Sequence, residues 1–133
     1  MAIEFSVTVR NARLDAIETA IGTGAVLKIR TLSPPSDCAQ ADVGTVLATL
    51  TLPSDWMAAA GSGQKAKLGT WQDASADASG VAAHFRIYAS DGTTIHAQGT
   101  VGQGSGDLSL DNATLVAGQS VTVTAFTLTD GNS

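Results

Sequence analysis

Short runs in which apolar and polar residues alternate occupy most of the chain after residue 24. This alternation is typical of half-buried β-strands, because successive side chains of a strand point to opposite faces. In residues 25–31, Leu27 and Ile29 fall on one face, whereas Lys28 and Arg30 fall on the other. Glycine, aspartate and proline separate the runs at short intervals. About seven strands are predicted, which favours a mainly β fold, either an antiparallel β-sandwich or a squat barrel.

Two hairpins are predicted in the second half of the chain. The first turns at Ser90-Asp91-Gly92, because an Asp-Gly pair between two alternating runs is a strong hairpin signal. The second is expected to join 108–115 to 120–129. Within 120–129 the apolar positions change parity, which indicates a β-bulge or burial on both faces. Upstream of the hairpins we expect a loop over 33–44, strands over 45–52 and 65–72, and one helical turn over 56–60.

The first part of the chain has a different period. Leu14, Ile17 and Ile21 recur at helical spacing, Ser6 can cap the start of a helix, and Gly22 or Gly24 can end it. The pattern predicts an amphipathic helix over 7–21 that packs on its own domain or on a neighbouring subunit. The chain is therefore divided into an N-terminal helical arm, residues 1–24, and a β-sandwich domain, residues 25–133.

Composition excludes several classes of protein. The 133 residues are enough for one domain, 44% of them are hydrophobic, and only 14% are charged. These values exclude a disordered chain and a coiled coil. The net charge of −5 disfavours nucleic acid as a partner. Because no run approaches 18 apolar residues and no signal peptide is visible, we expect no membrane association.

The titratable residues do not form a pattern that indicates chemistry. His84 and His96 are not cross-strand partners in either of the two registers considered for the hairpin, and Cys38 is alone in a proline-containing loop. The aspartates lie mostly in turns, where their side chains bond to nearby backbone amides. The glycines of 102–106 join two strands and therefore lack the strand-to-helix context of a phosphate-binding loop. We expect no catalytic residues, no metal site and no cofactor, so the chain is predicted not to be an enzyme.

Low charge on the strands predicts that the protein forms assemblies. Natural sheets usually protect their edges with charged side chains, proline or bulges, and this chain has few charges to offer. We therefore expect a homo-oligomer, with a trimer favoured. Most of the aromatic residues are assigned to the core, but Trp56 is expected to be partly exposed. The candidate subunit contacts are Leu14, Ile17, Ile21, Trp56 and Met57.

Several segments together resemble a known family. They are residues 10–18, 25–30, 44–50, 52–57, 69–77 and 84–92, among them Leu-Pro-Ser-Asp-Trp-Met at 52–57 and His-Phe-Arg-Ile-Tyr at 84–88. Together they resemble a family of small proteins encoded in the structural-gene region of tailed bacteriophages and prophages.

The resemblance implies a virion structural protein without catalytic residues. Such a protein would be made in the cytoplasm of the host bacterium and built into the virion, where its partners are major capsid or tail subunits. The role would be capsid decoration (cement) or tail-associated assembly. A host-surface glycan-binding module of a tail or fibre is the alternative.

Overall fold

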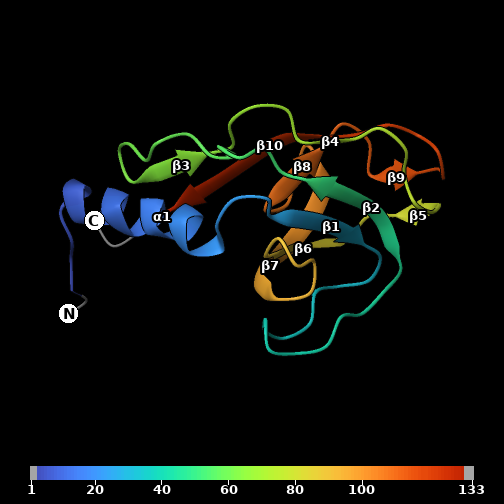
Figure 1. Cartoon of the computed structure of the whole chain (residues 1–133), viewed down its shortest axis with the longest axis horizontal. Coiled ribbons are helices and arrows are strands. Elements are labelled where there is room, and N and C mark those ends of the chain that lie inside the picture. Colours follow the sequence, from blue (N-terminus) through green and yellow to red (C-terminus); the bar gives the residue numbers. More distant parts are fainter. Residues whose placement is uncertain (1–2, 131–133) are drawn as a thin grey trace.

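Residues 3–130 are described by the structure, a computed structural model in which one helix precedes a set of short strands (Figure 1). The helix α1 spans Val7–Ile21. The strands are β1 (Val26–Arg30), β2 (Val46–Thr51), β3 (Gln64–Ala66), β4 (Gln72–Asp73), β5 (Gly80–Val81), β6 (His84–Tyr88), β7 (Ile95–Gln103), β8 (Leu108–Leu110), β9 (Thr114–Leu115) and β10 (Val121–Thr129). The prediction of a mainly β fold with an N-terminal helix is confirmed.

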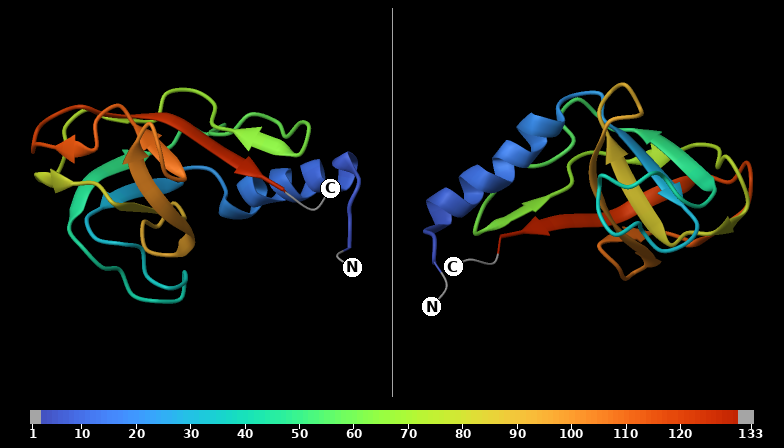
Figure 2. Two further views of the ribbon diagram at one scale, coloured as in Figure 1. Left: turned by 180° about the vertical axis from the view of Figure 1, so that it is seen from behind. Right: turned by 90° about the horizontal axis from the view of Figure 1, so that it is seen from below.

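One long sheet dominates the molecule. Its strand order is β2-β1-β6-β7-β8-β10-β3, β4 also pairs with β10, and β5 and β9 form a separate two-stranded sheet. The long sheet curls into a half-barrel, and α1, β3 and the end of β10 extend from one side of it (Figures 1 and 2). All pairs are antiparallel except β7 and β8, which run parallel. Left-handed backbone at Gly104 and Gly106 helps the short segment between β7 and β8 turn the chain back.

Four aromatic rings run in contact through the core. The ring centroids of Trp56 and Trp71 are 5.9 Å apart, those of Trp71 and Phe126 are 5.4 Å apart, and those of Phe126 and Phe85 are 5.7 Å apart. Tyr88 is also fully buried. The assignment of most aromatic residues to the core is confirmed, because such large side chains contribute much of the apolar area that a small domain can bury.

Trp56 differs from the expectation. It is only 1% exposed, so the prediction of a partly exposed side chain is wrong. The predicted helical turn over 56–60 is also absent, because this segment pairs with the chain around β3: Leu68 N–H donates to Trp56 C=O at 2.9 Å. The indole Nε1–H donates to Gly22 C=O at 3.2 Å. Tertiary pairing therefore overrides the local preference of a short alanine-rich stretch.

The helix α1 packs on its own chain, over β3. Its Ser6 cap accepts a hydrogen bond from Val9 N–H, as the sequence predicts. Beneath the helix, the ammonium group of Lys65 on β3 lies 2.7 Å from a carboxylate oxygen of Asp15 and 3.0 Å from one of Glu18. Lys65 is only 2% exposed, so the two helix carboxylates compensate a buried charge.

The strand registers agree with some of the sequence predictions. The pairing of β10 with β8 is irregular between Val123 and Ala125, as the change in parity within 120–129 predicts. The β6–β7 hairpin turns at the expected Asp-Gly pair, but His84 opposes Thr100, a register that differs from both of those considered. The irregularity that causes this shift lies at the turn end of β7, beside His96. The two histidines are not cross-strand partners, which confirms that prediction.

Other parts of the chain cover the outer strands of the long sheet. Beside β2, the Asp73 carboxylate accepts a hydrogen bond from Thr49 N–H at 3.0 Å, and Asp77 N–H donates to Leu47 C=O at 2.7 Å. Beside β3, segment 56–61 forms backbone hydrogen bonds along the strand. The expectation of unprotected edges is therefore wrong for β2 and β3.

Candidate functional site

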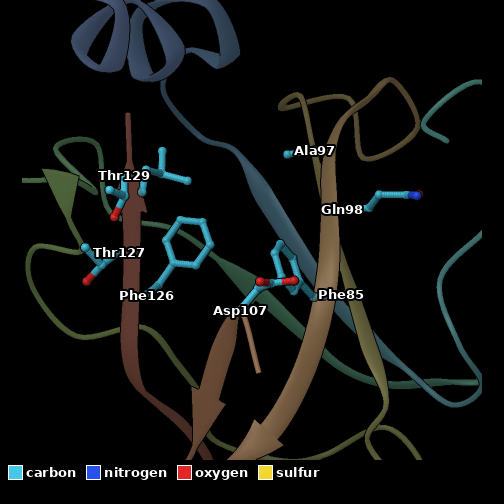
Figure 3. A pocket seen from close by; sticks show the side chains of 8 residues that line it. Phe85, Ala97, Gln98, Asp107, Phe126, Thr127 and Thr129 are labelled. Atoms are coloured by element: carbon cyan, nitrogen blue, oxygen red, sulfur yellow. The ribbon is translucent and has the colours of Figure 1, made fainter. Parts of the chain in front are cut away.

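A groove opens inside the long sheet where β8 begins. β8 separates β7 from β10 but pairs only with residues 101–103 of β7 and 123–126 of β10. Both neighbouring strands extend past it, β7 back to Ile95 and β10 on to Thr129. Between these extensions lies a groove of about 480 Å³ (Figure 3). We call it the β7–β10 groove.

Apolar side chains form the floor of the groove. The rings of Phe85 and Phe126 meet edge to face, with an interplanar angle of 88°, and they lie between the two strands in Figure 3. Ala97 and Leu128 add aliphatic surface. Both phenylalanines are at least 95% buried, because they also belong to the core. A ligand in the groove would therefore rest on the rigid core of the domain.

On the β10 side, backbone N–H and C=O groups form the wall of the groove. Phe126 C=O accepts a hydrogen bond from Lys67 N–H, and Asp130 N–H donates to Gly63 C=O, so the even-numbered residues bond toward β3. Because the backbone groups of successive strand residues point to opposite sides, those of Thr127 and Thr129 point into the groove. Outside the regular strand pairings, no backbone hydrogen bond of Thr127 or Thr129 is found among residues 3–130.

On the β7 side, backbone groups also point into the groove. Val101 N–H donates to Ala83 C=O on one side, and Thr100 N–H donates to the Asp107 carboxylate on the other, at 2.9 Å. The same alternation directs the backbone N–H and C=O of Gln98 into the groove. Its side chain points away, toward Arg86 Nε and Pro35 C=O (Figure 3).

Asp107 closes the end of the groove next to β8. Its carboxylate accepts hydrogen bonds from both the N–H and the hydroxyl of Thr100, and so takes the place of the next residue of a strand. Gly99 makes room for this contact. A Cβ atom there would lie 2.8 Å from the Phe85 ring and 2.9 Å from an Asp107 carboxylate oxygen, so any larger residue would displace one of them.

A second polar cluster fixes the loop over 33–44 on the convex face of the sheet. Asp42 accepts hydrogen bonds from Arg86 (2.9 Å), Tyr88 (2.7 Å) and Arg30 (3.1 Å). Partial burial alone would raise the pKa of Asp42, but these hydrogen bonds and the two guanidinium charges lower it below its ordinary value. Burial and the bond to Asp42 raise the pKa of Tyr88. Arg30, predicted to face outward, is buried because this loop covers it.

Most of the candidate subunit contacts lie in the interior of the chain. Leu14, Ile21, Trp56 and Met57 are all at least 92% buried, so they leave almost no surface for a partner. Ile17 is 38% exposed and remains available. Leu14 and Ile21 pack the helix on its own chain, which was one of the two alternatives left open by the sequence.

The remaining sequence candidates do not converge. His84 is buried, its Nδ1 lies 2.6 Å from Leu32 C=O, and its Nε2 has no hydrogen-bond partner. Cys38 is half-buried in the 33–44 loop. Within residues 3–130, no three His, Cys, Asp or Glu side chains are placed to hold a metal ion.

Comparisons of the chain with protein-family models, curated proteins and solved structures find no match. The resemblance to phage structural proteins therefore remains a prediction. In the described part of the chain, no helix is both long enough and apolar enough to cross a membrane.

Proposed function

We propose that the chain is a non-enzymatic structural subunit that works by associating with other polypeptides. The β7–β10 groove carries this proposal. Its walls offer unpaired backbone N–H and C=O groups, and its floor is apolar. These features match an extended polypeptide, because a strand satisfies such groups on both sides and places alternate side chains on the floor.

The sequence resemblance supplies the biological setting of this proposal. A subunit of a tailed-phage virion, in capsid decoration or tail assembly, repeats the same contact many times within one symmetric particle. The glycan-binding alternative receives less support, because sugar stacking needs an exposed ring. Trp56, Trp71 and Tyr88 are at most 1% exposed.

The virion role is tested by mass spectrometry of particles induced from a bacterium that encodes the chain. We expect the protein to copurify with intact particles in a fixed ratio to the major capsid or tail protein. If complete particles contain none of it, the virion role is wrong. The copy number then distinguishes a head or tail-tube component, which is abundant, from a neck or fibre component, which is scarce.

A further inference from the structure

We propose that the β7–β10 groove binds residues 1–5 of a second copy of this chain, as an added β-strand between β7 and β10. The proposal rests on the proposed function, since it names the partner of the assembling subunit. At one end of the groove, β8 fills the gap between the same two strands, and an added strand would continue the line of β8 into the groove.

The segment before α1 has the chemistry that the groove requires. In Met-Ala-Ile-Glu-Phe, the large apolar residues Met1, Ile3 and Phe5 alternate with Ala2 and Glu4, so an extended conformation places the three on one face. Ile3 is 75% exposed, more than any other large hydrophobic residue in the described range. An extended segment in the groove would place the exposed isoleucine against the apolar side chains of the floor and remove it from water.

The donor is a second copy because the segment is held away from its own sheet. Phe5 C=O accepts a hydrogen bond from Arg10 Nε at 3.3 Å, and the Arg13 guanidinium lies 4.6 Å from the centre of the Phe5 ring. These contacts keep Phe5 at the end of α1 that is farthest from β1, and this end of the helix lies far from the half-barrel (Figures 1 and 2).

This contact has a consequence for symmetry. Donor and acceptor are different surfaces of the same chain, so each copy can give one segment and receive another. Such a heterologous contact closes into a ring or continues as a filament, and a ring of three would account for the trimer expected from the sequence.

Amide hydrogen exchange measured residue by residue tests the proposal. When the protein is concentrated from a dilute monomer into its assembled form, we expect exchange at Thr127 and Thr129 to slow by roughly tenfold or more. Leu128, which lies between them, is the internal control, because its N–H already faces β3 and should stay protected in both forms. Equal exchange rates at Thr127 and Thr129 in the two forms would overturn the proposal.

Two matched variants identify the donor. Ile3→Asp should shift the assembly midpoint, measured by light scattering, to at least roughly tenfold higher concentration, because a carboxylate would be buried against the phenylalanine floor. Val116→Asp makes the same change at another exposed aliphatic residue, 58% accessible, and should leave the midpoint unchanged. If Ile3→Asp assembles like the parent, or if the parent stays monomeric, the proposal is wrong. The virion role is then still decided by the particle experiment.

Discussion

Asp42 fixes the loop over 33–44 that covers the convex face of the sheet. It is the shared acceptor of Arg30 and Arg86, which are 7% and 0% exposed. We expect Asp42→Ala to lower the free energy of unfolding by about 3 kcal/mol, because removing one partner leaves buried cations uncompensated. Urea unfolding followed by tryptophan fluorescence measures this. Asp55→Ala, at an exposed aspartate, should change it by less than about 0.5 kcal/mol. Equal effects of the two substitutions would contradict this role.

Stability should fall in acid, because protonation neutralises carboxylates that the folded state stabilises in their charged form. The pKa values of Asp15, Asp42 and Asp91 lie below the ordinary 3.8, and hydrogen bonds from Thr94 and Thr93 bring that of Asp91 to about 2. A carboxyl with a lowered folded-state pKa stabilises the fold above its unfolded pKa, and this contribution disappears as pH falls through the folded value. The free energy of unfolding should therefore decrease below about pH 4. The decrease should be smaller in Asp42→Asn, and a parallel pH profile for that variant would exclude Asp42 as a contributor.

At the scale of elements, the sequence predicts those whose signals are local. The helix over 7–21 has its cap, the buried Leu14 and Ile21 and its terminating glycine within one segment. The Asp-Gly turn and the change in parity within β10 are also local, and all of these predictions are confirmed. The segment around Trp56 was mispredicted because distant partners decide its structure. The groove could not be predicted, since it depends on how far β8 extends relative to β7 and β10. The pairing of these three strands is known only from the fold.

Gly99 is a local signal for the groove, because a glycine inside a strand often marks a close approach of other groups. We expect Gly99→Ala to lower the free energy of unfolding by about 1–3 kcal/mol, because the new methyl group would displace the Phe85 ring or Asp107. Gly61→Ala is the matched control: its Cβ would meet no atom within 4 Å and its φ is not in the left-handed region. Denaturant midpoints of the two variants provide the measurement, and a neutral Gly99→Ala would show that this end of the groove is not tightly packed.

At the scale of the whole molecule, we expect α1 to be part of the fold and not a detachable arm. Removing residues 1–22 would expose the surfaces that bury Leu14 and Ile21, each worth about 1.5–3 kcal/mol. It would also leave the buried Lys65 without Asp15 and Glu18, a further cost of about 3–5 kcal/mol. These losses are comparable with the whole stability of a typical domain, about 5–15 kcal/mol.

We therefore expect a chain that begins at residue 23 to lose cooperative thermal unfolding, as monitored by circular dichroism. The matched control is a chain that lacks only residues 1–5. It retains the Ser6 cap and the buried Leu14 and Ile21 and loses only the contacts of Phe5 with Arg10 and Arg13, so it should unfold at nearly the parental temperature. The same control should also fail to assemble if residues 1–5 fill the groove of a second copy, which separates the role of the segment from that of the helix. If the chain from residue 23 unfolds cooperatively near the parental temperature, α1 contributes little to the core, and residues 25–133 form an independent domain.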